Sequence, residues 1–215
     1  GPRDGFDETL RVNTSLLRRR IKDPGLRIES MELGKRSKTA IGICYIYDIV
    51  NQKTLDELRK RLDKINIDAI LESGYIEQLI EDSSLSPFPQ IQYTERPDKA
   101  AAAILEGRIV VLVDTTPFAL IVPATFAQFF QSPEDYYERW IIGSLTRIIR
   151  FAASYIAVFV PGLYVSAIAF HPGLVPIKLS LAIAAAREGV PFPVVVEALL
   201  MEISFEFLRE AGARL

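Results

Sequence analysis

Three glutamates near the end of the chain have the spacing that most clearly allows a chemical function. Glu202, Glu206 and Glu210 recur every four residues, so on a helix they lie within about 80° of one another. Acids at bilayer depth are costly unless they pair or face water, and rings of acids select cations. The spacing predicts a candidate ion path or interface. The alternative is an interfacial amphipathic helix whose acids meet water or pair locally with Arg209 and Arg214.

Enzymatic chemistry finds little support in the sequence. The single histidine, His171, allows no Ser-His-Asp set and no multi-histidine metal site. Asp114 ends an apolar strand pattern, where enzymes with α/β folds often place an acid, but an acid here more simply caps the turn at residues 115–117. We predict no catalytic residue, no cofactor and no metal site, and we predict that the chain is not an enzyme.

The composition divides the chain into two parts. Of 215 residues, 49% are hydrophobic and 24% charged, with a net charge of -2. Most lysines and arginines precede residue 151, and the long apolar runs follow it. The nearly neutral net charge implies no general footprint for nucleic acid. The single Cys44 permits no intrachain disulfide and suits a reducing compartment.

The longest uncharged stretch is residues 151–170. As a helix it would extend about 30 Å, the thickness of the hydrocarbon core of a bilayer. Arg147 and Arg150 precede it and Lys178 follows it. We predict a transmembrane helix at about 151–170 and, from the positive-inside rule, a soluble domain on the cytoplasmic side. The alternative is a buried core helix, which Pro161-Gly162 in its middle favours.

The residues before this stretch carry alternating strand and helix patterns, which predict a small α/β domain. Apolar periodicity and turn residues predict helices over 7–22, 51–65, 75–80, 98–105, 123–130, 134–150 and 194–213, and strands over 26–33, 39–49, 66–71, 91–93, 108–114 and 118–122. The helix at 134 has Ser132 as N-cap and Pro133 at its first position. The predicted fold is therefore an α/β soluble domain at 1–140, followed by membrane-spanning or amphipathic helices at 141–215.

Several long segments, taken together and in order, resemble the GerA family of spore germination proteins. They are GPRDGFDETLRVNTSLLRRRI, GKRSKTAIGICYI, SPFPQIQYTERPDKAAAAILEGRIVVLVD, PATFAQFFQSPEDYYERW and AIAAAREGVPFPVVVEALLMEISFEFLREAG. The family contains the A subunits of spore germinant receptors and the related protein SpoVAF. The QSPEDYYERW segment is more similar to a receptor A subunit than to SpoVAF.

The resemblance implies a membrane protein without catalysis. It implies an A subunit that works with B and C subunits in the inner membrane of a bacterial spore, as a homo-oligomer that forms a nutrient-responsive ion channel and triggers germination. By the same comparison, 1–140 is the second of two N-terminal subdomains and 151–170 is the first of several membrane helices. In such a bundle, Pro161-Gly162 becomes a kink or a close-packing point.

Two further expectations accompany this interpretation. Because the sequence begins at Gly1-Pro2 and ends inside a helical pattern, we expect it to be part of a longer protein. The alternative function is a soluble α/β module that binds a ligand or a protein and whose apolar C-terminal half is core.

Overall fold

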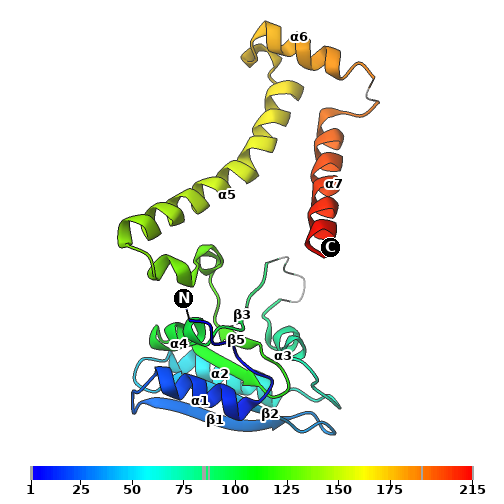
Figure 1. The fold of residues 1–215 in the computed structure, drawn as a ribbon. Coiled ribbons are helices and arrows are strands. Elements are labelled where there is room, and N and C mark those ends of the chain that lie inside the picture. Colours follow the sequence, from blue (N-terminus) through cyan, green and yellow to red (C-terminus); the bar gives the residue numbers. More distant parts are fainter. Residues whose placement is uncertain (1, 84–85, 87, 190, 215) are drawn as a thin grey trace. The chain divides into compact units, whose positions relative to one another are not determined.

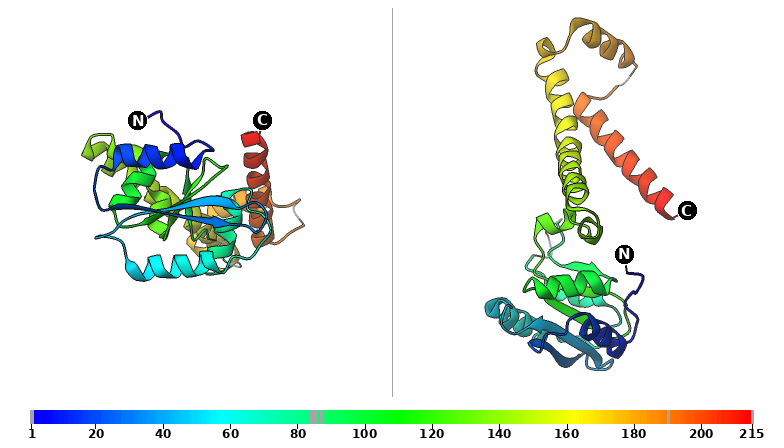
Figure 2. Two further views of the ribbon diagram at one scale, coloured as in Figure 1. Left: turned by 90° about the horizontal axis from the view of Figure 1, so that it is seen from below. Right: turned by 60° about the vertical axis from the view of Figure 1, so that its left-hand side comes forward.

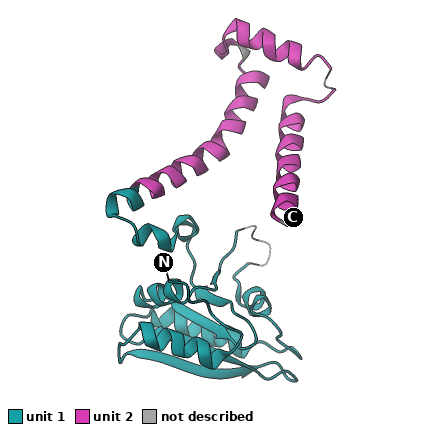
Figure 3. Ribbon diagram, in the orientation of Figure 1, with its two compact units in different colours: residues 1–144 teal, residues 145–215 magenta. Residues whose placement is uncertain are grey.

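The computed structural model describes residues 2–83, 86, 88–189 and 191–214. The chain divides into two compact units, residues 1–144 and residues 145–215 (Figure 3). Among the described residues, the first unit holds the sheet, four α-helices, two short 3-10 helices and the start of a fifth α-helix, and the second unit is helical.

A five-stranded sheet forms the centre of the first unit (Figure 1). Its strands lie in the order β1-β2-β4-β5-β3, and all neighbours pair antiparallel. Their bounds are β1 Leu26–Leu33, β2 Thr39–Ile46, β3 Gln92–Thr94, β4 Ile109–Val113 and β5 Ala119–Val122. β4 has five buried residues in a row and occupies the middle of the sheet, as its two-faced apolar pattern predicts.

Helices cover both faces of the sheet (Figure 2). One face carries α1 Leu10–Arg20 and α4 Pro97–Leu105, and the other carries α2 Gln52–Asp63 and α3 Ser73–Ile80. Successive strand residues point to opposite faces, so Val111 packs with α2 and α3 while Val110 and Leu112 pack with α1 and α4. The sheet thus separates two apolar cores, and the predicted α/β soluble domain is confirmed.

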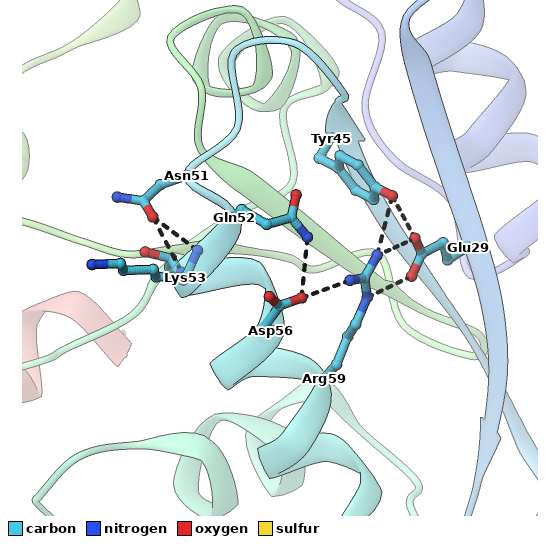
Figure 4. A network of polar contacts seen from close by, with 8 residues as sticks. Glu29, Tyr45, Asn51, Gln52, Lys53, Asp56 and Arg59 are labelled. Atoms are coloured by element: carbon cyan, nitrogen blue, oxygen red, sulfur yellow. Dashed lines mark hydrogen bonds and ion pairs between the residues drawn. The ribbon is translucent and has the colours of Figure 1, made fainter.

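A polar network ties α2 to the β1 edge of the sheet (Figure 4). Arg59 on α2 donates from Nε to Oε2 of Glu29 on β1 at 3.0 Å, and the Tyr45 hydroxyl on β2 donates to the same carboxylate. The hydrogen bond from Arg59 outweighs the effect of burial and lowers the pKa of Glu29. At the start of α2, the side chain of Asn51 accepts hydrogen bonds from the backbone N–H groups of Lys53 and Thr54.

The strand predicted at 66–71 is absent, and that prediction is wrong. The segment instead hydrogen-bonds the turn between β1 and β2: Lys35 N–H donates to the Ile67 carbonyl at 3.0 Å. The Thr39 hydroxyl donates to the Ile70 carbonyl at 2.6 Å. These bonds satisfy the backbone without a ladder, so an extended apolar segment here did not require a strand.

The prediction of one continuous helix over 134–150 is also wrong, because the structure has two separate helices there. Ser132 and Asp135 form a capping box, as the predicted start requires, but they begin only a short 3-10 helix, η2 Pro133–Tyr136. The chain then starts a separate helix, α5 Trp140–Ala169. The predicted helix at 123–130 is likewise a short 3-10 helix, η1 Phe126–Phe130.

The C-terminal helices α5, α6 Ile177–Ala186 and α7 Val194–Arg214 leave most of their apolar side chains exposed. Among the described residues, Val194 is the one buried hydrophobic side chain that lies after residue 144. α5 is long and apolar enough to cross a membrane, with no part of its apolar window buried. Residues 151–169 of the helix predicted at 151–170 therefore belong to a longer helix that starts at Trp140 and continues through Pro161.

Candidate functional site

The carboxylate of Asp98, in the first turn of α4, connects the sheet domain to the segment that leads into α5. Arg96 donates to it from Nε at 3.2 Å and from Nη2 at 2.9 Å. The Tyr137 hydroxyl, just after η2, donates to the same carboxylate. The Asp98 side chain is only 10% exposed. Burial favours the neutral acid, but the hydrogen bonds from Arg96 and Tyr137 prevail and lower the pKa of Asp98 to about 2.

Gly143, in the first turn of α5, fits closely against η2. A Cβ atom at this position would lie 2.3 Å from the Asp135 carbonyl oxygen and 3.2 Å from its carbonyl carbon. Backbone atoms cannot move aside as a flexible side chain can. The start of α5 is therefore packed on η2, and η2 is tied to α4 through Tyr137. This continuous set of contacts, which we call the junction, runs from α4 through η2 to the start of α5 and contains Asp98, Asp135, Tyr137 and Gly143.

The predicted membrane-flanking residues lie at the expected places along the helices. Arg147 and Arg150 are half-buried residues of α5 that precede its uncharged part, and Lys178 is an exposed residue in the first turn of α6. Their role at a membrane surface stays a prediction. A Cβ atom added at Gly162 would have no atom of the described residues within 4 Å. The prediction that another helix packs closely against Pro161-Gly162 therefore stays a prediction.

The three glutamates of the candidate ion path lie on one uninterrupted helix, α7, so they share a face as their spacing predicts. All three are exposed. Glu206 forms an ion pair with Arg209, which is the local pairing of the alternative interpretation. The side chain of Arg214 lies outside the described part of the chain. The role of Glu202, Glu206 and Glu210 therefore stays a prediction.

Asp114 has a structural role. Its Oδ1 accepts a hydrogen bond at 2.9 Å from the backbone N–H of Leu10, the first residue of α1. It thus caps a helix that is distant in sequence, whereas the sequence predicted a cap of the turn after β4, where Thr115 has a φ of 74°. A carboxylate at a helix N-terminus also favours the helix dipole.

The single thiol and the possible metal-ligating side chains all lie in the described part of the chain. Cys44 is fully buried in β2, and burial raises the pKa of its thiol to about 12. Within residues 2–83, 86, 88–189 and 191–214, no three His, Cys, Asp or Glu side chains gather as a metal site requires.

The sequence profile described as Bacillus/Clostridium GerA spore germination protein matches residues 1–215. The chain belongs to the GerA family. The predicted resemblance is therefore confirmed over the whole chain.

Several curated proteins align with all of this chain at 50–54% sequence identity. Spore germination protein KA of Bacillus subtilis (strain 168) is 54% identical over 215 residues, which are 100% of this chain and 40% of that protein. Spore germination protein GerLA of Bacillus cereus is 50% identical, over 100% of this chain and 44% of that protein. The uncharacterized membrane protein YfkQ of Bacillus subtilis (strain 168) is 51% identical, over 100% of this chain and 42% of that protein. The chain thus spans less than half the length of these relatives.

One solved structure is also similar. It is the crystal structure of the N-terminal domain of the A subunit of the Bacillus megaterium spore germinant receptor GerK3. It is 53% identical, covers 57% of this chain and 98% of that chain, and has a TM-score of 0.47.

The junction of this GerA family member was not found from the sequence. Pro97-Asp98 signals a helix start, but its partner Tyr137 follows 39 positions later, and no local pattern joins the two. Gly143 interrupts the apolar pattern of the helix that begins at Trp140, and a glycine inside a helix is a signal of close packing. That signal could have located one end of the junction.

Proposed function

We propose that this chain is part of an A subunit of a spore germinant receptor, and that the complete protein acts in a nutrient-responsive ion channel in the inner membrane of the spore. The observation that carries the proposal is the match to the GerA family along all 215 residues. Sequence identities of 54% to spore germination protein KA and 50% to GerLA support the same process.

The proposed membrane region begins in α5. A helix of 30 residues extends about 45 Å, more than the roughly 30 Å of hydrocarbon that it must cross. The uncharged part from residue 151 would span the bilayer, and 140–150 would reach into the headgroup layer. The exposed apolar side chains of α5, α6 and α7 favour this arrangement over the soluble module, since the described residues of these helices form no core of their own.

Detergent dependence tests the membrane region. We expect the 215-residue chain to aggregate without detergent or lipid, because the exposed apolar surface of α5 needs cover. A monodisperse preparation without detergent would favour the soluble ligand-binding or protein-interaction module.

The proposed orientation places the sheet domain in the spore core, on the cytoplasmic side, because Arg147 and Arg150 precede the span and Lys178 is the nearest cation after it. Proteolysis of oriented vesicles tests this. Cleavage within 1–140 from the outside would contradict it.

The proposed ion path uses the acidic face of α7. Glutamine in place of Glu202, Glu206 and Glu210 removes the charges and keeps the size, so cation flux should fall in at least one single variant and in the triple variant. Glu188→Gln, an exposed acid between α6 and α7, is the matched control. Unchanged ion flux and germination in all single variants and in the triple variant would exclude these residues from the path.

The proposed partners are the B and C subunits, other copies of the A subunit, and lipid. Affinity purification of the full-length A subunit from spores, followed by crosslinking, tests these contacts. The proposal expects the two other subunits to copurify and the crosslinks to join more than one A subunit.

A further inference from the structure

Three phenylalanines form an exposed aromatic patch on the first unit. Phe88, Phe126 and Phe129 are 63%, 63% and 39% exposed. Phe88 meets Phe126 edge to face with ring centroids 6.0 Å apart, and Phe130 meets Phe126 at 5.0 Å. The rings of Phe88 and Phe126 therefore support each other in an exposed position. We call Phe88, Phe126 and Phe129 the aromatic patch.

The segments that carry the aromatic patch have no charged residue. They are 83–94, before and including β3, and 115–133, which contains β5 and η1. This is unusual for a domain whose other surfaces carry most of the lysines and arginines of the chain. Phe88, Phe126 and Phe129 also line an open hollow of about 920 Å³ together with Pro123 and Ala124, and Asp82, whose side chain is 75% exposed, lies at the same hollow. An exposed aromatic cluster of this kind marks a place that is covered in the working protein.

Chain connectivity limits how far the patch can lie from the start of α5. Only nine residues separate Phe130 from Trp140, so the two can lie at most about 35 Å apart. Trp140 begins α5, whose first 11 residues precede the uncharged span. Residues 126–140 include six aromatic residues, and aromatic rings concentrate in the interfacial layer of membranes.

We propose that the aromatic patch lies in the interfacial layer of the membrane that α5 crosses, so that the sheet domain is held against the lipid surface at two points: α5 and the patch. This inference rests on the membrane region of the proposed function. In a lipid interface the exposed rings gain an apolar environment, and the one carboxylate at the hollow, Asp82, is paired with Arg61, which lowers the cost of bringing it near the headgroups.

The test uses tryptophan as a depth probe in the 215-residue chain in phosphatidylcholine–phosphatidylglycerol vesicles. Trp140 is the only tryptophan, so Trp140→Phe gives a silent background. Onto it we would place one reporter at a time: Phe126→Trp or Phe88→Trp in the patch, Phe159→Trp in the span, and Glu32→Trp as control. Glu32 is an exposed residue of β1, at the sheet edge opposite β3.

The expected result is several-fold stronger quenching of both patch reporters by lipids brominated near the headgroup than of the Glu32→Trp control, with weaker quenching by aqueous iodide. The Phe159→Trp reporter should respond to deeply brominated lipids. Patch reporters that behave like the control while Phe159→Trp is quenched would overturn this inference and leave the proposed span intact. No quenching at Phe159→Trp would overturn both. Two patch positions are used so that poor folding of one variant does not decide the outcome.

Discussion

Asp98 joins two parts of the chain that lie far apart in the sequence. Its carboxylate accepts hydrogen bonds from Arg96, the residue just before α4, and from Tyr137, just after η2. Because these donors stabilise the ionised form, the pKa of Asp98 falls to about 2 in the folded protein. An aspartate in an unfolded chain has a pKa near 3.9. The ionised carboxylate of Asp98 is therefore more stable in the folded chain than in the unfolded chain.

The first prediction concerns the stability that this carboxylate contributes. A lowered folded pKa gives stability that is complete above pH 4 and is lost as pH falls toward 2. Asp98→Asn should lower the free energy of unfolding by about 1–2 kcal/mol at pH 7, and its difference from the unmodified chain should shrink between pH 4 and 2. Urea unfolding in detergent at several pH values measures this. An equal difference at pH 7 and pH 2.5 would contradict the role of the charge.

Tyr137→Phe is the companion to that variant. It removes one donor and leaves the Arg96 pair, so it should cost less than Asp98→Asn, about 0.5–1.5 kcal/mol. A larger loss in Tyr137→Phe than in Asp98→Asn would show that the ring, and not the hydrogen bond, holds η2.

The second prediction concerns Cys44, the single thiol. Burial in β2 raises its pKa to about 12, and the thiolate is the reactive form. Iodoacetamide at pH 8 should therefore leave the folded chain unlabelled and should label it fully in urea. Mass spectrometry measures both. Rapid labelling of the folded chain would show that the sheet opens at β2.

At the scale of elements, α5 depends on a glycine in its first turn. Gly143 lies so close to η2 that a methyl group would meet the Asp135 carbonyl oxygen at 2.3 Å. Gly162 lies in the same helix with no described neighbour within 4 Å of that position. The two glycines therefore form a matched pair for substitution.

The third prediction is that Gly143→Ala separates the start of α5 from η2, at a cost of about 1–3 kcal/mol. Gly162→Ala should be neutral in the isolated chain or stabilise the helix by up to about 1 kcal/mol. Amide hydrogen exchange across 133–146 measures the junction. Equal exchange in Gly143→Ala and the unmodified chain would mean that this contact does not hold α5.

Most elements of the sheet domain could be predicted because their signals are local. The apolar run before Asp114 indicates β4, and Pro97 indicates the start of α4. The wrong secondary-structure predictions fall where tertiary contacts determine the local structure. Hydrogen bonds to the β1–β2 turn replace a strand at 66–71, and packing of Gly143 on η2 accompanies the break in the helix predicted over 134–150.

The strand order belongs to the whole molecule and could not be predicted from local patterns. β2 pairs with β4 through Ile41 and Val113, although α2, α3, β3 and α4 lie between them in the sequence. The candidate site also contains one feature that a local pattern predicts and one that depends on the fold. The shared face of Glu202, Glu206 and Glu210 follows from their spacing, whereas the contact of Asp98 with Tyr137 requires the folded sheet domain.

At the same scale, family membership and the helical second unit lead to one functional account. A chain that matches the GerA family throughout, and whose C-terminal helices expose apolar side chains, fits a sheet domain attached to a membrane region. The junction packs the start of α5 against η2, which Tyr137 ties to α4 of the sheet domain.

The most direct measurement of this account is ion flux through the complete protein. The full-length A subunit would be reconstituted with its B and C subunits in vesicles loaded with an ion indicator, and flux would be recorded with and without a panel of amino acids and sugars. The account predicts flux that rises when an effective nutrient is added and that requires the A subunit. Flux that is absent under all conditions in which the same proteins support spore germination, or that is unchanged when the A subunit is omitted, would contradict it.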